Sequence, residues 1–417
     1  MREKLRFPVK RALPMLAVAS CALSITMGAH AQTVDCSGLS SHVIYVAGST
    51  AVQPFLATIG KNLAALNPPI YVVYQGQGSC VGVGALANPD DTTKNSITGT
   101  ATYWDTTGAA LTCNLAAITG NVVDIGVSDV FAASCGQTPP STVKDFHGPV
   151  QAMTFAVPVT STQTSISAEA AYMVFGFGAD SAAHTILPWN DATALEVRSA
   201  SSGTQQMISA ALAQVGSGFT ASKFKGVSNS GSGGVLTGLT TLASGGNAEK
   251  AVGILSADFM DKNRASVKEL YYQHVGQGCG YLPDSSPTAF DKQNVRDGHY
   301  AVWGPLHMLA RVDTAGKANN PDVKTVLDIL TGAVEPSFDL LSVEAKGGVV
   351  PDCAMRVMRT SEVGPMASYM PDKSCECKFV AAATGTAPTG CKTCTKANEA
   401  TDCTSAAPHC NYGYCEL

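Results

Sequence analysis

The strongest constraint on the fold of this 417-residue chain is a repeated order of β-branched runs, Gly/Ser turns and helical patterns. The first unit begins at His42 and reads HVIYVAGSTAVQPFLATIGKNLAAL, and the second reads IYVVYQGQGSCVGVGAL. Further strand patterns are VVDIGVSDVF, QAMTFAVPV, YMVFGFG and KAVGILSADF. Strands that alternate with helices predict an α/β fold built on parallel sheets.

Local signals predict where two of the helices start. Thr50 and Gln53 match a capping box, and Pro54 fits the first helical turn, where a missing N–H costs least. A second helical pattern covers residues 204–215 and directly follows a loop rich in hydroxyl groups.

The first 31 residues have the pattern of a secretory signal peptide. Five basic residues precede an apolar stretch that ends in the small-x-small sequence Ala29-His30-Ala31. The sequence Val-Ala-Ser before Cys21 also resembles a lipobox, so a lipid anchor at Cys21 is the alternative. Cleavage after Ala31 is favoured because the apolar stretch continues past Cys21. Either route predicts export to the periplasm or cell surface, and no later apolar run is long enough to span a bilayer.

The mature chain is acidic. Removing the five basic residues and one acidic residue of the leader changes the formal net charge from −5 to −9. Nucleic acid is therefore an unsuitable partner, because binding to a phosphate backbone needs a basic stripe that this sequence does not show. Any anion that the protein binds must be held by local donors.

The 386 residues that follow the leader exceed what one hydrophobic core usually serves. We expect two lobes and a small appendage. Residues 32–150 and 285–373 would form the first lobe, with a surface insertion at 84–121 tethered by a disulfide. Residues 151–284 would form the second lobe, and 374–417 a cysteine-rich tail.

Thirteen cysteines follow Ala31, six between Cys36 and Cys353 and seven between Cys375 and Cys415. In an oxidising compartment they predict disulfides, with one thiol left over and the pairing undetermined. The tail has almost no apolar periodicity, so we expect bridges rather than a core to hold it. Zinc is the alternative interpretation for four of the tail cysteines, namely Cys375, Cys377, Cys391 and Cys394.

Four loops carry the same donor-rich chemistry, and each follows a predicted strand. Their residues are Ser49 and Thr50, then Gly78 and Ser79, then Asp129 after Ser128, and finally Arg198 with Ser202, Gly203 and Thr204. Open α/β sheets bind ligands at the carboxyl ends of their strands. Helix starts offer unpaired N–H groups and a partial positive charge, so these loops predict a site for a small anion.

Two charged residues define what this site would hold. Arg198 could clamp two oxygens of a tetrahedral oxyanion. Asp129 can only accept a hydrogen bond, so it would favour an anion that still carries a proton and reject sulfate. Taken singly, each loop also fits a simpler interpretation, since such residues commonly act as helix caps, turns or surface ion pairs.

These loops resemble those of the periplasmic phosphate-binding receptors of ABC transporters. The similarity is carried by AGSTAVQPF, YQGQGS, VDIGVSD and RSASSGT, in that order, with weaker likeness in KAVGIL and HYAVWG, over roughly residues 42–335. It implies a two-lobed type II periplasmic-binding-protein fold. By the same resemblance, the phosphate ligands would be Thr50, Ser79, Asp129, Arg198, Ser202, Gly203 and Thr204.

The sequence also departs from that family. Ala200 stands where the family places an aspartate that pairs with the arginine, and Ala51 stands where an aromatic residue is common. The insertion at 84–121 is longer than usual, the stretch from Trp189 to Arg198 is shorter, and the cysteine-rich tail is not a family feature. These differences bear on affinity and ligand identity more than on the fold.

The resemblance implies an exported receptor that captures inorganic phosphate, or a related oxyanion, and delivers it to the membrane permease of an ABC transporter. A surface or scaffold protein that keeps the fold without transport is one alternative, and a secreted hydrolase or phosphatase is another. The sequence has no Gly-x-Ser-x-Gly turn and no histidine motif tied to a nucleophile. We therefore expect no catalysis, no metal and no cofactor.

Overall fold

The structure is a computed structural model that describes residues 34–417. The expected signal peptide and the alternative lipid anchor at Cys21 lie outside the described residues. Within residues 34–417, no helix combines the length and the apolar character needed to cross a membrane.

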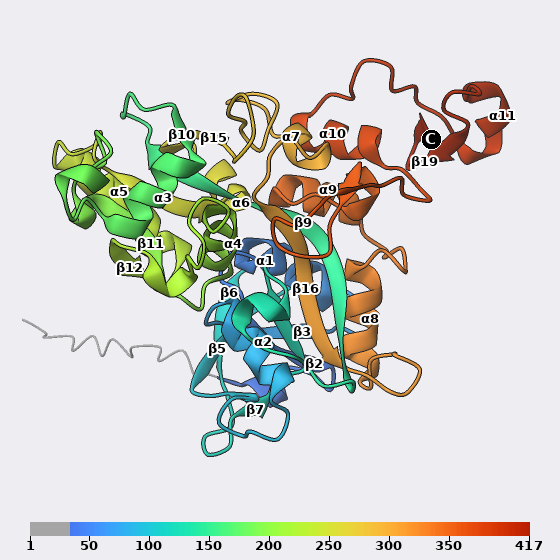
Figure 1. The fold of residues 1–417 in the computed structure, drawn as a ribbon. Helices are drawn as coiled ribbons and strands as arrows, with labels where there is room; N and C mark the ends of the chain where they lie inside the picture. Colours follow the sequence, from blue (N-terminus) through green and yellow to red (C-terminus); the bar gives the residue numbers. More distant parts are fainter. Residues whose placement is uncertain (1–33) are drawn as a thin grey trace, which may run out of the picture. The chain divides into compact units, whose positions relative to one another are not determined.

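The chain is organised around one 12-stranded mixed sheet (Figure 1). In spatial order its strands are β1 (Val34–Asp35), β6 (Ala110–Asn114), β5 (Thr100–Trp104), β3 (Tyr71–Gly76), β2 (Val43–Gly48), β8 (Ile125–Ser128), β16 (Trp303–Arg311), β9 (Val143–Pro158), β13 (Val252–Ser256), β11 (Leu195–Arg198) and β12 (Val227–Asn229), with β14 (Val267–Glu269) also paired to β9. Four small pairs lie outside it, namely β4 (Ser96–Ile97) with β7 (Asn121–Val122), β10 (Ser165–Ser167) with β15 (Tyr271–Gln273), β17 (Val357–Met358) with β18 (Ala367–Ser368), and β19 (His409–Asn411) with β20 (Tyr414–Glu416).

The expectation of parallel sheets is correct only for part of each half of the large sheet, and β5 runs antiparallel to both β3 and β6. β2 is parallel to β3 and β8, and β11 is parallel to β12 and β13. We call the half around β2 lobe 1 and the half around β11 lobe 2. Where the halves meet, β16 runs antiparallel to both β8 and β9, and β9 runs antiparallel to β13.

β9 is long enough to belong to both lobes. Its 16 residues span about 50 Å at the usual rise of a strand. It pairs with β16 from Val143 to Ala152 and with β13 from Met153 to Ala156. The lobe boundary expected after residue 150 therefore falls inside a continuous strand.

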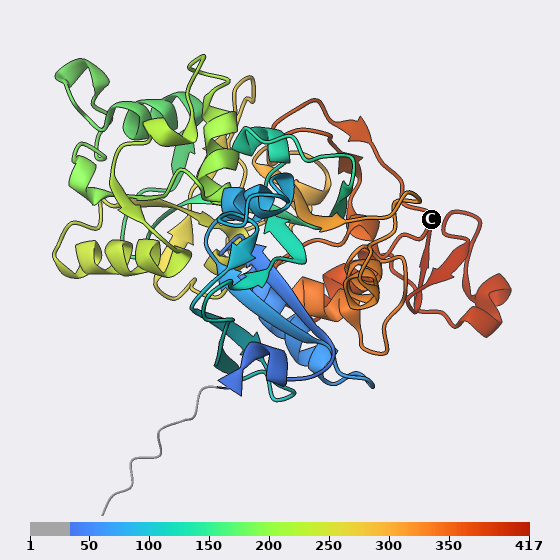
Figure 2. The same ribbon diagram turned by 90° about the horizontal axis from the view of Figure 1, so that it is seen from below.

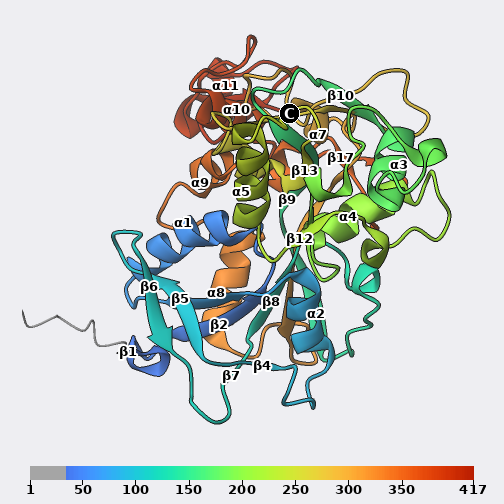
Figure 3. The ribbon, with the colours of Figure 1, turned by 90° about the vertical axis from the view of Figure 1, so that its left-hand side faces the viewer.

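Helices cover the two lobes (Figures 1 and 3). Lobe 1 carries α1 (Gln53–Ala64), α2 (Ser79–Ala87) and α8 (Pro321–Leu330), and lobe 2 carries α3 (Ala168–Phe177), α4 (Gly203–Leu212), α5 (Ser232–Ser244) and α6 (Ala257–Asp261). The short α7 (Gln293–Arg296) and α9 (Leu340–Gly347) come later in the chain. The capping box expected at Thr50 does not form, because α1 starts at Gln53 after Val52 and the Thr50 hydroxyl accepts a hydrogen bond from Arg198 instead.

The segment 84–121 is more than the surface insertion expected from its composition. Its strands β5 and β6 extend the large sheet next to β3. Trp104 is only 2% exposed and packs beside Tyr74, with the two ring centroids 6.0 Å apart. The expected tether is present as the disulfide Cys36–Cys113. Hydrophobic burial of Trp104 therefore makes this segment part of the lobe 1 core.

Among residues 34–417 six disulfides are formed, and Cys279 is left as an exposed free thiol, as the odd number predicted. The pairs are Cys36–Cys113, Cys80–Cys135, Cys353–Cys375, Cys377–Cys391, Cys394–Cys410 and Cys403–Cys415. The zinc interpretation of Cys375, Cys377, Cys391 and Cys394 is wrong, because each of these sulfurs is bonded to another cysteine.

The cysteine-rich tail is anchored by a helix as well as by bridges. Its first element, α10 (Glu376–Thr384), packs on α9 and buries Phe379 to 1% exposure in the large core of lobe 2. The rest of the tail, with α11 (Glu399–Asp402) and β19–β20, extends on the side away from lobe 2 (Figure 2). The expectation that bridges alone hold the tail is therefore wrong for residues 376–384.

A buried carboxyl lies beside β9 where the lobes meet. Asp258 at the start of α6 is 1% exposed, and Gln151 of β9 donates to its Oδ1 at 3.4 Å. Burial raises the pKa of Asp258 from 3.8 to about 7, and the nearby charges of Asp129 and Asp261 add to the effect. Between about pH 4 and about pH 7 the folded protein therefore holds a proton at Asp258 that the unfolded chain has released.

Replacing Phe379 with alanine should lower the free energy of unfolding by about 3 kcal/mol, because it leaves a cavity where the tail joins the core. Urea denaturation followed by circular dichroism measures the change. Met370→Ala is the control, since this side chain is 72% exposed and its loss should cost less than about 0.5 kcal/mol. Equal stability of the Phe379→Ala variant and the wild type would show that bridges alone fix the tail.

The Asp258 carboxyl should make the protein less stable as the pH rises from about 4 to about 7. In this window the folded state binds more protons at Asp258 than the unfolded state, so stability falls with pH by at most about 1.4 kcal/mol per unit. Denaturation at pH 5, 6, 7 and 8 should show a shallower slope for Asp258→Asn than for wild type. Identical slopes would mean that Asp258 is ionised throughout.

Candidate functional site

The nine residues expected to form an anion site come together between the two lobes. Ser49 and Thr50 follow β2, Gly78 and Ser79 follow β3, and Asp129 follows β8, all in lobe 1; Arg198 ends β11, and Ser202, Gly203 and Thr204 open α4, all in lobe 2. The placement at the carboxyl ends of strands agrees with the sequence-based expectation. Contacts between these segments define the site.

Asp129 is the central acceptor on the lobe 1 side. It is 1% exposed, and its Oδ2 accepts hydrogen bonds from Ser49 Oγ at 2.6 Å and Ser79 Oγ at 3.2 Å. The Asp129 backbone N–H also donates to Ser79 Oγ at 3.1 Å. The other carboxyl oxygen, Oδ1, is buried and has no hydrogen-bond partner among the described residues.

The protonation of Asp129 reflects this setting. Burial raises its pKa, because removing a carboxylate from water disfavours the charged form. The hydroxyls of Ser49 and Ser79 oppose the rise, and so does the positive charge of Arg198. The pKa of Asp129 therefore stays above its usual value, although its immediate donors and Arg198 limit the rise.

Arg198 supplies a buried positive charge on the lobe 2 side. It is 2% exposed, and one guanidinium nitrogen donates to Thr50 Oγ1 at 2.8 Å and to the Ser230 carbonyl at 3.2 Å. The other donors reach Ser232 Oγ at 3.2 Å and the Asn229 carbonyl at 3.4 Å. Within residues 34–417 this guanidinium forms no ion pair with a carboxylate.

Arg198 is oriented without a carboxylate at position 200, where this chain has Ala200. Neutral acceptors from the loop before α5 hold the guanidinium instead, through the Ser230 and Asn229 carbonyls and the Ser232 hydroxyl. Burial lowers the pKa of Arg198, and the charge of Asp129 acts against that shift. Because guanidinium stays protonated in proteins, the result is a buried cation whose charge no carboxylate of the described chain neutralises by direct contact.

Glycines allow the start of α4 to press against the lobe 1 loops. A Cβ atom added to Gly203 would lie 2.3 Å from Ser79 Oγ and 2.5 Å from Asp129 Oδ2. Gly78 has φ = +103° and lies against the Ser201 carbonyl, which also accepts a hydrogen bond from the Cys80 N–H at 3.1 Å. Any side chain at Gly203 would therefore disturb the contact between the lobes.

The first turn of α4 presents further polar groups. Thr204 is fully buried, and its Oγ1 has no hydrogen-bond partner among the described residues. Ser202, 2% exposed, is the residue before the helix, and its side chain makes no capping bond. A buried hydroxyl without a partner costs stability unless a ligand or water satisfies it.

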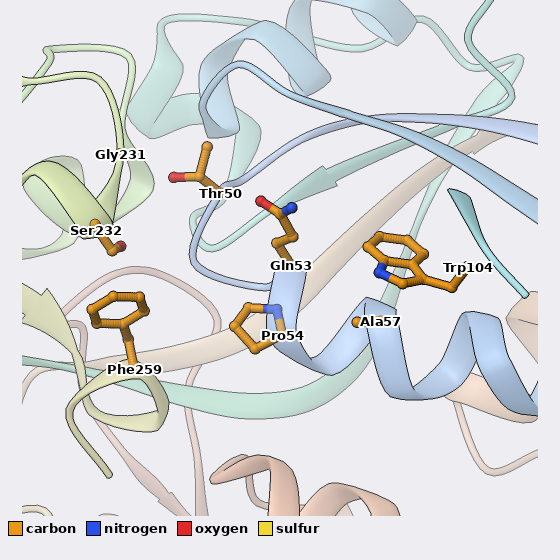
Figure 4. A pocket seen from close by; sticks show the side chains of 9 residues that line it. Thr50, Gln53, Pro54, Ala57, Trp104, Gly231, Ser232 and Phe259 are labelled. Atoms are coloured by element: carbon orange, nitrogen blue, oxygen red, sulfur yellow. The ribbon is translucent and has the colours of Figure 1, made fainter. Parts of the chain in front are cut away.

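A cavity of about 380 Å³ adjoins the Arg198 contacts. It is lined by Thr50, Gln53, Pro54, Ala57, Trp104, Gly231, Ser232, Gly233 and Phe259. Figure 4 shows Thr50 and Ser232, the two hydroxyl partners of Arg198, on one side of this cavity and Trp104 on the other. The cavity therefore reaches the hydroxyl partners of Arg198, but Thr50 is the one residue of the nine expected site residues that lines it.

Sequence reasoning missed several residues of this arrangement. Ser232 and the carbonyls of Asn229 and Ser230 come from the sequence SNSGSGGVL, a Gly/Ser loop that precedes a helix, as three of the recognised loops do. That shared pattern could have identified it. Tyr74, whose hydroxyl donates to the Ser49 carbonyl, lies in an apolar strand and gave no such signal.

The sequence matches no protein-family model and no curated protein. Among solved structures, one similar protein is described as a candidate phosphate ABC-transporter substrate-binding protein from Clostridium perfringens, solved with bound phosphate. It is 13% identical, the alignment covers 74% of this chain and 99% of that one, and the TM-score is 0.50. An ABC-type phosphate transport receptor from Vibrio cholerae is 16% identical over 74% of this chain and 99% of its own, with a TM-score of 0.44.

At 13% and 16% sequence identity, a structural similarity can show a shared fold but not a shared function. Of the two alignments, the one with the Clostridium perfringens protein is close enough to support a shared fold. This alignment and the two-lobed mixed sheet together identify the fold, and the disulfide-bonded tail is an addition to it. The chain has the two-lobed α/β fold of the type II periplasmic binding proteins, a fold shared with phosphate-transporter substrate-binding proteins, and carries a small disulfide-rich C-terminal appendage.

Proposed function

We propose that this protein is an exported receptor that binds hydrogen phosphate between its two lobes and delivers it to the membrane permease of an ABC transporter. One observation carries the proposal: a buried guanidinium without a carboxylate partner faces the same interlobe site as a buried carboxylate with one unused oxygen. Burying these two groups costs folding free energy, and a ligand that pairs with both would recover part of that cost.

Hydrogen phosphate matches these two groups. Its charged oxygens would receive hydrogen bonds from Arg198, from the Thr204 hydroxyl and from the N–H groups at the start of α4. Its remaining O–H would donate to Asp129 Oδ1, the oxygen that lacks a partner. Sulfate has no such proton at neutral pH, so its oxygens would meet the Asp129 carboxylate with no hydrogen between them.

Ligand binding would also favour the closed arrangement of the lobes. The contacts that already join them include Arg198 with Thr50, the Ser201 carbonyl with the Cys80 N–H, and Gly203 with Asp129. A ligand held by donors from both lobes binds the closed form better than the open one and shifts the population toward it. A permease could then distinguish loaded from empty receptor by the relative position of the lobes.

Asp129→Asn should change which anion the protein selects. An asparagine can turn an N–H toward the ligand, so it tolerates a fully deprotonated oxyanion. We expect the wild type to bind phosphate and arsenate far more tightly than sulfate, whereas the variant should lose about ten- to a hundred-fold in phosphate affinity and gain sulfate binding. Isothermal titration of ligand-stripped protein at pH 7.5 measures all three anions.

Asp124→Asn is the matched control for this titration, because Asp124 is a half-buried carboxylate that accepts from the Tyr45 N–H outside the site. Its anion preference should equal that of the wild type. If stripped wild-type protein binds none of the three anions, the receptor proposal fails, and a surface or scaffold role on the same fold becomes the better explanation.

Thr204→Val should separate ligand binding from stability. Valine has the shape of threonine but lacks the buried hydroxyl that is unpartnered in the described chain. The free variant should be at least as stable as the wild type, while its phosphate affinity should fall by about 1 kcal/mol, or roughly five-fold. Thr154→Val, at another fully buried threonine, should leave phosphate affinity unchanged. Unchanged affinity in Thr204→Val would remove Thr204 from the site.

A further inference from the structure

Three groups that commonly ligate metals lie on one face of the β9–β16 pair. Asp145 and His147 are two residues apart on β9, so their side chains leave the same face of the sheet. His307 on β16 is the direct cross-strand partner of His147. Side chains that face each other across two strands are close enough to share a ligand.

The distances between the ligand atoms are short. His307 Nδ1 lies 2.7 Å from Asp145 Oδ2, and His147 Nε2 lies 3.6 Å from the same oxygen. One ligand atom from each of the three residues falls within 4.8 Å of the others. Zinc bonds of 2.0–2.1 Å in a tetrahedral site place neighbouring ligand atoms roughly 3.3 Å apart, so small shifts would admit a cation.

The surroundings hold His307 in place, whereas His147 and Asp145 are partly open to solvent. His307 is fully buried, and the Phe131 ring packs on it with centroids 4.2 Å apart. The side chains of His147 and Asp145 are 37% and 30% exposed. Asp145 Oδ1 has no hydrogen-bond partner among residues 34–417, so the carboxylate can still engage through its second oxygen.

The open side faces a large cavity. His147 is among the residues that line a space of about 800 Å³ between β9, the segment from α8 to α9, and the tail. Asp352, Glu344, Tyr369, Lys378 and Tyr412 are also among its lining residues. A cation held by three protein ligands would therefore keep room for water or a small ligand at a fourth position.

We propose that Asp145, His147 and His307 form a binding site for a divalent transition-metal ion of the zinc type. Two imidazoles with one carboxylate suit zinc and its neighbours, whereas calcium and magnesium prefer oxygen ligands. The site is separate from the anion site and involves none of the nine residues described there. The competing possibility is a metal-free cluster in which Asp145 accepts hydrogen bonds from both histidines.

The test is a zinc titration of purified, chelator-stripped protein in phosphate-free buffer. A Cys279→Ser background removes the exposed free thiol as an alternative zinc ligand. We expect one zinc ion per chain with micromolar or tighter affinity by isothermal titration. Binding should weaken at least about ten-fold in His147→Ala and in Asp145→Asn, the latter a change that keeps the shape of the side chain.

The matched control is His184→Ala, because His184 pairs with Asp180 at 2.6 Å and belongs to a two-residue ion pair. It should bind zinc as the parent does. Cobalt provides a second readout, since its visible absorption bands should appear on binding to the parent and be lost in His147→Ala. No zinc binding by the parent, or equal binding by His147→Ala and the parent, would overturn the proposal and support the hydrogen-bonded cluster.

Discussion

The antiparallel pairing of β9 with β16 is the constraint on which the rest of the structure depends. β9 pairs with β16 along its first part and with β13 along its second, so this one strand joins the two lobes. β16 also pairs with β8, which ends at Ser128 directly before Asp129. The same pair therefore sets the position of the Asp129 carboxylate in the proposed anion site and brings His147 opposite His307.

The site between the lobes contains buried charged groups that have no directly paired opposite charge among the described residues. The Arg198 guanidinium donates to hydroxyls and carbonyls. The Asp129 carboxylate accepts from two serine hydroxyls, and its backbone N–H donates to one of them. The two opposite charges therefore attract each other, but within residues 34–417 Arg198 and Asp129 form no ion pair. Such an arrangement costs stability in the free protein. Under the proposed function, the same arrangement would pre-organise donors and one acceptor for an anion, so that the protein would bind it without a basic surface.

Disulfide bridges and hydrophobic burial both attach the tail to the rest of the protein. The disulfide Cys353–Cys375 ties the start of the tail to the main chain, and α10 then inserts Phe379 into the lobe 2 core. Beyond α10 three further bridges and the carboxylate of Glu416, which accepts from the N–H groups of Glu376 and Cys377, hold the segment. Tail and core together enclose the cavity beside His147.

The sequence by itself determined most of the alternation of strands and helices, the hydroxyl-rich loops at strand ends and the odd thiol, because these features depend on residues close together in the chain. The strand expected at YMVFGFG is wrong, because this stretch forms the end of helix α3. Only the tertiary structure decided the antiparallel strands at the centre, the cysteine pairing and the loop at Ser230 and Ser232 that orients Arg198. It also decided the cluster of Asp145 and His307, which are 162 residues apart. Local patterns carry no information about the register between such distant strands, and register decides which side chains meet.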